Sequence, residues 1–486
     1  MEAATSISLR FAEGTSAVVR ARLSYALRVF AAVYGYRVED KESVASSFRL
    51  TYGEPSVFTD SVTDCHVPSR YRARPLCERP PSPVKHVYAD ETVFLFYGVD
   101  PATGNPDWLG EIFEWVSCDL ELNIKARDSI GRIPLSEGIF AREKITARRP
   151  HAMPVMAWLE NYLRQGGNHQ ALARPTSPLK GWEHIVVCSH DLDFYFTGRG
   201  RTLKRLGKNL GVGVLLYRDW TFTMWNAWRL VRAALGERVG DYLPDLLDEA
   251  HRREFTSTLF AVARHGHRRD PDYTLAQLCG RLISARQAGF EVALHGSYGS
   301  VVERRDLAAE ASLLAGAAGR VPLGNRQHWL RFDAYEHLFE CVEGARLAYD
   351  SSLGFDETAG FRNGAAFAFP PYDFKKERPH EFLEIPLALM DGSIEADTRK
   401  SHEKARDIVR EVLEESRRWG WGGISLLWHN PIEPLHVPEE INRIFWECAE
   451  ARGYFAEKWM SAEEFLRLCL PRYQNAGLLR GVHLDA

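Results

Sequence analysis

The stretch Ile185-Val186-Val187-Cys188-Ser189-His190-Asp191-Leu192-Asp193-Phe194 decides the expected fold. Its apolar first half is typical of a buried strand, and the run stops at two carboxylates spaced one residue apart. Because side chains alternate along a strand, Asp191 and Asp193 project the same way if the extended conformation continues past Ser189. Two acids at the end of a strand suit a metal ligand beside a general base, although a simple turn also explains them.

Later segments repeat the order of apolar run, polar residue and helix. The run 290–294 ends at His295, and the run 320–323 leads to Arg326 and His328. Similar runs lead to Asp350 and to His429. This alternation is typical of a (β/α) barrel, in which reactive groups follow the carboxyl ends of the strands. We therefore expect an α/β fold in which these side chains and the two carboxylates after residue 190 converge on one pocket.

The first 172 residues form a smaller α/β unit in this interpretation. Helices are expected over 20–36, 110–122 and 155–163, and strands over 48–52 and 93–97. Residues 165–168 and 174–178 are rich in Gly, Pro and other helix breakers, which is typical of a domain boundary. We expect an N-terminal α/β domain of unknown role over 1–172. The barrel is expected over 180–475, with a helical insertion near 200–272.

The bulk composition excludes some classes of partner. The chain has 486 residues, 45% of them hydrophobic, and a net charge of −4, which gives no reason to expect nucleic acid or an anionic membrane as an obligate partner. The basic run 199–205 contacts a phosphate or an acidic glycan, or is a solvated helical face. No stretch resembles a membrane span or a signal peptide, and the eight scattered cysteines favour reduced thiols, so we expect a cytoplasmic protein.

The order of motifs resembles the polysaccharide deacetylases, carbohydrate esterase family 4, which carry the NodB homology domain. The resemblance covers roughly residues 180–470. The matching motifs are Ser189-His190-Asp191-Leu192-Asp193, His295-Gly296-Ser297-Tyr298-Gly299-Ser300, Arg326-Gln327-His328-Trp329, Tyr349-Asp350-Ser351-Ser352 and Leu427-Trp428-His429. Segments 326–329, 349–355 and 361–364 resemble a divergent subgroup with an extra N-terminal α/β domain.

This resemblance implies metal-dependent removal of N-acetyl groups from a carbohydrate. A divalent cation, most often zinc, binds Asp193 and His295 and polarises the acyl carbonyl. Asp191 is the implied general base, oriented by a two-pronged contact from Arg326. His429 protonates the leaving amine with Asp350 supporting its cationic form, and a backbone N–H near Trp329 holds the oxyanion.

The sequence departs from the family pattern at the metal site. The second histidine of the family motif falls at Gly299, which has no side chain. The missing ligand is then His328, His190 or the hydroxyl of Ser300. Two further alternatives stay open. Arg362 is a surface salt bridge or a clamp for an anionic substrate, and Trp182, Trp329 and Trp428 are core residues or a platform for sugars.

Three functions are therefore considered. The first is a hydrolase of N-acylated sugars, acting on a glycan precursor in the cytoplasm. The second is a catalytically inactive barrel that binds carbohydrate or organises an assembly. The third is a hydrolase of another carbon–nitrogen amide bond. The oligomeric state stays open.

Overall fold

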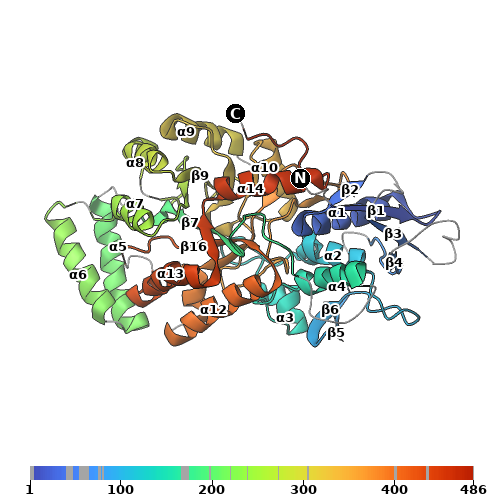
Figure 1. Ribbon diagram of the computed structural model, residues 1–486. Helices are drawn as coiled ribbons and strands as arrows, with labels where there is room; N and C mark the ends of the chain where they lie inside the picture. Colours follow the sequence, from blue (N-terminus) through green and yellow to red (C-terminus); the bar gives the residue numbers. More distant parts are fainter. Residues whose placement is uncertain are drawn as a thin grey trace.

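A computed structural model describes residues 5–39, 47–53, 65–74, 78, 81–165, 174–195, 199–218, 220–237, 239–271, 273–303, 306–398, 402–433 and 437–484. At its centre is a parallel sheet with nine strands among these residues, in the order β14-β11-β10-β9-β8-β7-β16-β15, with β17 beside β7 (Figure 1). The strands are β7 (His184–Asp191), β8 (Thr258–Val262), β9 (Glu291–Gly296), β10 (Gly324–Gln327), β11 (Tyr349–Asp350), β14 (Leu383–Glu384), β15 (Leu387–Met390), β16 (Gly422–Leu427) and β17 (Glu457–Met460). The predicted mixed α/β fold built on a parallel sheet is confirmed.

The two edges of this sheet are joined by one short segment. Residues 383–390 run from β14, which pairs with β11, to β15, which pairs with β16. Between these strands, Ile385 N–H donates to the Asp350 carbonyl, and Ser425 N–H donates to the carbonyl of Pro386. The sheet therefore curves into a barrel, and the carboxyl ends of its strands face one another at one end.

Helices cover the outside of the barrel, so its strands are buried on both faces. They are α7 (Leu243–Arg252), α8 (Leu275–Gln287), α9 (Leu307–Ala318), α10 (Tyr335–Gly344), α11 (Asp391–Thr398), α12 (His402–Trp419), α13 (Glu439–Ala451) and α14 (Ala462–Asn475). A capping box formed by Ser461 and Glu464 begins α14. Gly319 ends α9 in the left-handed conformation, with φ +71°.

A helical hairpin follows β7 before the chain returns to β8. It consists of α5 (Arg199–Val212), a π-helical segment η5 (Gly213–Tyr217) and α6 (Trp220–Ala234). In Figure 1 this hairpin lies at the outer left edge, on the side away from the N-terminal elements. It occupies much of the region predicted as a helical insertion. The strand β8 within that region was not anticipated, because its residues resemble the end of a long helical segment.

The N-terminal elements form a second, smaller parallel sheet in the order β2-β1-β3-β4. Its strands are β1 (Ser6–Phe11), β2 (Arg37–Glu39), β3 (Phe48–Tyr52) and β4 (Cys65–Val67), and a hairpin of β5 (Val84–Tyr88) and β6 (Glu91–Leu95) follows. The helices are α1 (Ala17–Tyr34), α2 (Trp108–Val116), α3 (Ile139–Glu143) and α4 (Ala152–Gln165).

These N-terminal elements pack directly against the barrel. The Trp421 indole N–H donates to the Val33 carbonyl at 3.0 Å, and the Tyr25 hydroxyl donates to the Pro370 carbonyl at 2.7 Å. One cluster of buried apolar side chains includes Ile7 in β1 and Phe465 in α14. Residues 166–173 of the predicted domain boundary lie outside the described residues, and the division at 172 stays a prediction. Within the described residues, no helix is both long and apolar enough to cross a bilayer.

Candidate active site

Asp193 is the centre of a polar cluster at the carboxyl end of the barrel. It lies in a 3-10 turn, η4 (Leu192–Phe194), directly after β7. Its Oδ1 is 3.3 Å from His295 Nε2, and its Oδ2 is 3.1 Å from His328 Nε2. His429 Nε2 lies 3.9 Å from the same Oδ2. Three strand ends that are distant in sequence therefore bring their imidazoles to one carboxylate.

The tautomer of His295 is fixed by its other nitrogen. His295 Nδ1 lies 2.8 Å from the Arg326 backbone carbonyl, which can only accept, so Nδ1 carries the proton. In the neutral imidazole Nε2 then presents a lone pair toward Asp193. Both His295 Nε2 and Asp193 Oδ1 are buried and have no hydrogen-bond partner among the described residues. This arrangement leaves two ligand atoms available on the same side of the cluster.

His328 reaches the cluster from η6 (His328–Leu330), the turn that follows β10. Its Nδ1 is 3.5 Å from Asp270 Oδ1, and Asp270 also accepts hydrogen bonds from three backbone N–H groups, those of Gly266, His267 and Tyr298. Burial alone would lower the pKa of His328, but the carboxylates of Asp193 and Asp270 outweigh it and raise this pKa to about 9. The two carboxylates therefore favour a positive charge at this place in the cluster, which either a proton on His328 or a bound cation supplies.

The residues present fit a divalent metal ion. One ligand atom each from Asp193, His295 and His328 lies within 4.8 Å of the others. The distances of 3.1 and 3.3 Å run from the two different oxygens of Asp193 to His328 Nε2 and His295 Nε2, so each carboxylate oxygen faces one imidazole. The orphaned ligand atoms of Asp193 and His295 provide a second, independent indication. The set of two histidines and one carboxylate is typical of a catalytic zinc site.

Asp191 lies beside this cluster and is held by Arg326. Its Oδ1 accepts from Arg326 Nη1 at 2.8 Å, and its Oδ2 lies 3.5 Å from His295 Nε2. The contact uses one nitrogen of the guanidinium, whereas two were expected. The other donors of Arg326 go to Ser351 and Ser425, and Nη1 is shared with Ser189. Arg326 is fully buried across the barrel interior, so its donors are divided among several strand ends.

The carboxylate that supports His429 is Asp391, in place of the expected Asp350. Asp391 Oδ1 lies 2.7 Å from His429 Nδ1, and its Oδ2 accepts from the His429 backbone N–H at 2.9 Å. Burial would lower the pKa of His429, but Asp391 together with Asp193 and Asp191 raises it to about 9. His429 is therefore suited to donate a proton near neutral pH.

Asp350 instead belongs to the structural interior of the barrel. It accepts from Asn325 Nδ2 at 2.7 Å and from the Ser352 backbone N–H at 2.9 Å. Burial raises its pKa, and it faces Glu384 of the neighbouring strand, whose pKa is also raised by burial. The two acids are adjacent across the β11–β14 ladder because strand order, which the sequence pattern did not predict, places them there.

Two other candidates for the third metal ligand have different roles. His190 faces away from the cluster, with Nδ1 2.6 Å from the Trp428 carbonyl and its ring against Phe445, and burial lowers its pKa to about 4. The Ser300 hydroxyl lies 2.9 Å from both the Ser297 carbonyl and Gln327 Oε1. Both side chains thus stabilise the fold around the cluster.

The exposed fractions of the side chains decide between the alternative roles considered for Arg362 and for the three tryptophans. Arg362 forms an ion pair with Glu121 at 2.9 Å, and both side chains are buried, so it is neither the expected surface salt bridge nor placed to clamp a substrate. Trp428 is buried in the core, and Trp182 precedes β7 and so lies at the opposite end of the barrel. Trp329 is 42% exposed beside His328 and remains the candidate sugar platform.

Sequence reasoning missed two residues of the cluster, Asp270 and Asp391. Asp391 follows the apolar strand Leu387–Met390 directly, so the same signal that identified Asp191 was present. Asp270 carried no comparable signal, because it lies in a loop after β8, the strand that was not anticipated.

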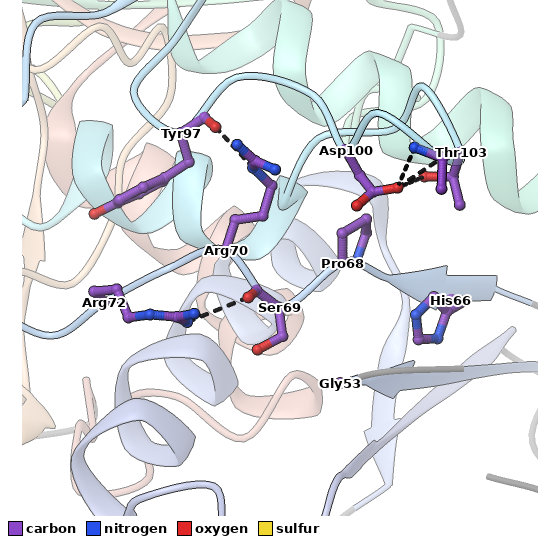
Figure 2. Close-up of a pocket in the computed structure, with 10 residues that line it drawn as sticks. Gly53, His66, Pro68, Ser69, Arg70, Arg72, Tyr97, Asp100 and Thr103 are labelled. Atoms are coloured by element: carbon purple, nitrogen blue, oxygen red, sulfur yellow. Dashed lines mark hydrogen bonds between the residues drawn. The ribbon is translucent and has the colours of Figure 1, made fainter. Parts of the chain in front are cut away.

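Two other polar sites are less suited to chemistry. The group Glu343, Asp373 and His380 also has ligand geometry, but Arg378 and Lys376 already neutralise its carboxylates. A cavity of about 410 Å³ lies among the N-terminal elements (Figure 2). There Arg70 and Arg72 donate to backbone carbonyls, and Asp100 accepts from Thr103. These polar groups are already committed to the local fold.

Comparisons with known proteins give distant structural similarities. The sequence matches no family model and no curated protein. Among solved structures, a polysaccharide deacetylase from Bacillus cereus is similar with a TM-score of 0.29 and 12% identity, covering 46% of this chain and 86% of that chain. A family 4 carbohydrate esterase from Streptomyces lividans, solved in complex with acetate, is similar with a TM-score of 0.29 and 12% identity. The match covers 57% of this chain and 92% of that chain. The peptidoglycan deacetylase PdaC from Bacillus subtilis is similar with a TM-score of 0.30 and 10% identity. The match covers 61% of this chain and 95% of that chain.

Proposed function

We propose that this chain is a metal-dependent hydrolase that removes an N-acetyl or other N-acyl group from a sugar or glycan precursor. One observation carries the proposal. Asp193, His295 and His328 each place a ligand atom in the same small region, and two of these residues have a buried atom there without a hydrogen-bond partner. A base candidate, Asp191, and an acid candidate, His429, flank this group. These residue types at these distances suit hydrolysis of an amide bond.

The three cluster residues would hold the metal, with zinc the proposed ion. When bound, a divalent cation polarises the acyl carbonyl and makes a nearby water more acidic. Asp193 supplies the negative charge of the site, and the Nδ1 hydrogen bond of His295 orients its ring.

The remaining steps are proton transfers by side chains of this chain. Asp191 accepts a proton from the attacking water, and Arg326 fixes the orientation of its carboxylate. The water oxygen bonds to the acyl carbon, and the carbon–nitrogen bond breaks as His429 donates a proton to the amine. Asp391 stabilises the cationic form of His429 and holds its ring. The products are a carboxylic acid and a free amine. A backbone N–H at Trp329 is the proposed donor to the oxyanion.

The proposed substrate class rests on the motif resemblance and on one exposed ring. The motifs from Ser189 to His429 follow the order found in polysaccharide deacetylases. Trp329 presents a partly exposed indole next to the cluster, which suits stacking on the apolar face of a sugar. A cytoplasmic glycan precursor and zinc both stay predictions.

The test is acetate release from N-acetylated saccharides and nucleotide sugars, with and without a chelator. We expect Asp191→Asn to lower kcat by about 10²–10⁴-fold while metal content is unchanged. Asp407→Asn, an exposed carboxylate on α12, is the matched control and should be fully active. Acetate release that ignores chelation, or an active Asp191→Asn protein, would contradict the mechanism.

The alternative is a barrel without catalytic activity that binds carbohydrate. It was motivated by Gly299, which removes the second histidine of the family motif. The position of His328 beside Asp193 supports the enzyme instead, because it offers a third ligand from another strand end. A purified protein that binds N-acetylated saccharides but takes up no zinc, cobalt or manganese would favour the alternative.

A further inference from the structure

Apolar side chains are exposed in unusual number on the α5–α6 hairpin. Within the described residues, seven of the fifteen exposed large apolar side chains lie between residues 214 and 235. They are Val214, Leu215, Trp220, Met224, Trp228, Val231 and Leu235. Leu215 is 82% exposed and Trp220 is 73% exposed. A concentration of this kind marks an interaction surface, whereas isolated exposed apolar residues do not.

These residues follow the period of a helix. Trp220, Met224, Trp228 and Val231 are three or four positions apart along α6, so they share one face of it. Phe222 and Asn226 on the opposite face are buried, and Asn226 accepts from Asn209 of α5 at 2.9 Å. The inner side of the hairpin combines this polar contact with a small apolar cluster of Leu206, Ala233 and Val239. The face with Trp220 and Trp228 is a second apolar surface, and it is exposed.

The hairpin also carries a strong positive charge. Residues 199–238 contain nine Arg or Lys and two acidic residues, in a chain whose net charge is −4. Lys204, Lys208 and Arg218 are exposed. Arg232 lies against the Trp228 ring at 4.5 Å and also pairs with Glu237. Long basic side chains beside apolar and Trp residues are typical of a helix that lies in a membrane interface.

The dimensions of α6 exclude a membrane span. Its 15 residues reach about 22 Å, less than the roughly 30 Å of a bilayer core, and it contains Arg229 and Arg232. A helix of this length and composition lies along the bilayer surface with its apolar face inserted between headgroups.

We propose that the α5–α6 hairpin docks this protein on a bilayer surface that contains anionic lipids. A second copy of the chain is the competing occupant of the apolar face. Symmetric pairing of two hairpins would bring two strongly basic surfaces together, whereas an anionic bilayer complements both the apolar face and the charge. The proposal goes beyond the proposed function and does not depend on it.

The base of the hairpin adjoins the candidate active site. The hairpin begins at Arg199, a few residues after Asp193 in the sequence. Arg229 in α6 pairs with Glu433 at 2.5 Å, four residues after His429. The Tyr242 hydroxyl, just after the hairpin, donates to the His429 backbone carbonyl at 3.1 Å. Docking through the hairpin would therefore hold the cluster near the lipid surface.

The test is co-sedimentation of the full chain with vesicles of phosphatidylcholine alone or mixed with phosphatidylglycerol. We expect binding to the mixed vesicles that weakens as salt is added. The double variant Trp220→Glu/Trp228→Glu should lower the partition coefficient by about tenfold or more. Lys204→Glu/Lys208→Glu should cause a loss of similar size, on anionic vesicles only.

Matched controls place the same changes elsewhere on the surface. Ile283→Glu/Leu313→Glu on α8 and α9 and Lys125→Glu/Lys144→Glu should bind the mixed vesicles like the wild type. The salt titration needs no variant, so it keeps the test valid if a hairpin variant fails to fold. Absence of wild-type binding to mixed vesicles would overturn the proposal. So would a wild-type dimer in sedimentation equilibrium that Trp228→Glu dissociates, without lipid binding by either protein.

Discussion

His328 is presented to the cluster by a strained turn. Trp329 and Leu330, the two residues after it, have φ values of 63° and 48°, in the left-handed region that residues with side chains rarely occupy. Each such residue costs about 1 kcal/mol or more, and the cost persists only where the surroundings impose it. Here the turn directs His328 Nε2 toward Asp193 and leaves the indole of Trp329 partly in solvent.

Replacing His328 should remove the metal and leave the fold intact. We expect His328→Ala to bind zinc about 100-fold or more weakly, because two protein ligands hold the ion poorly. Elemental analysis after dialysis measures this, with His337→Ala on α10 as the control, because His337 pairs with Asp333 away from the cluster. One equivalent of metal retained by His328→Ala would rule out His328 as a ligand.

Asp391 is expected to act as a positioning residue for the acid. Asp391→Asn removes the negative charge beside His429 Nδ1, so kcat should fall by about 10²-fold or more while KM changes little. Asp350→Asn is the matched control, since Asp350 bonds to Asn325 and Ser352 and should leave kcat near the wild-type value. The assignment fails if the Asp350 variant loses kcat and the Asp391 variant does not.

At the scale of secondary structure, most of the barrel could be predicted from the sequence. Apolar runs ending in polar residues located β7, β9 and β16, whereas the expected run 320–323 lies just before β10, which spans Gly324–Gln327. The boundaries were less accurate: His295 and Arg326 lie within strands and not after them. The strand β8 was missed because its five apolar or small residues follow a long helical pattern.

Side-chain partners were harder to predict than elements. Asp350 and Asp391 both follow apolar runs, and nothing in one sequence tells which of them faces His429. That choice depends on the order of strands in the sheet, where β15 and not β11 lies next to β16. The choice of His328 as third ligand likewise depends on the turn after β10, a feature of backbone geometry that composition does not reveal.

The strand β17 carries a buried acid that should make stability depend on pH. Burial would raise the pKa of Glu457, but hydrogen bonds from His184 and Trp459 and the charge of Arg417 lower it to about 2. Its contribution is present above the ordinary Glu pKa of about 4.3 and is lost as pH falls toward 2. Burial also lowers the pKa of His184, which reduces stability as pH falls below about 6.5.

We therefore expect the free energy of unfolding to decrease as pH falls from about 6.5 to 3. Glu457→Gln should be less stable than the wild type at pH 7 by roughly 3 kcal/mol and should show a smaller loss between pH 5 and 3. Urea unfolding across this pH range measures both. Parallel curves for the two proteins would show that Glu457 does not cause the dependence.

At the scale of the whole molecule, the N-terminal elements and the barrel share a buried ion pair. Glu121 accepts from Arg362 at 2.9 Å and from the Tyr335 hydroxyl. The guanidinium also packs against the ring of Phe355 at 5.3 Å. Removing one partner leaves the other as an uncompensated buried charge.

We expect Arg362→Met to lower the free energy of unfolding by about 3–5 kcal/mol, with kcat and KM unchanged in the folded protein. The double variant Arg362→Met/Glu121→Gln should recover part of this loss, because it no longer buries an unpaired carboxylate. Chemical denaturation measures the two variants. A raised KM without a change in stability would instead favour the substrate clamp.

The net charge of the whole chain does not reveal that one of its segments is strongly basic. The net charge of −4 gave no reason to expect an anionic partner, yet residues 199–238 are strongly basic. Net charge is a sum over the chain, whereas electrostatic attraction falls off within about 10 Å at moderate salt. The local distribution of charge therefore bears more directly on partners than the total does.

The contact between the first helix and the last one affects how the polypeptide matures. Arg472 of α14 donates to the carbonyl of Val33 in α1, across 439 positions of sequence, and Arg28 of α1 donates to the Ala476 carbonyl. The helix α2, which also packs against α1, is made soon after it, whereas α14 is made much later. The part of α1 that α14 covers therefore stays exposed until α14 has been made. A chain truncated before residue 462 should consequently keep chaperones bound, whereas a released chain that includes α14 should not.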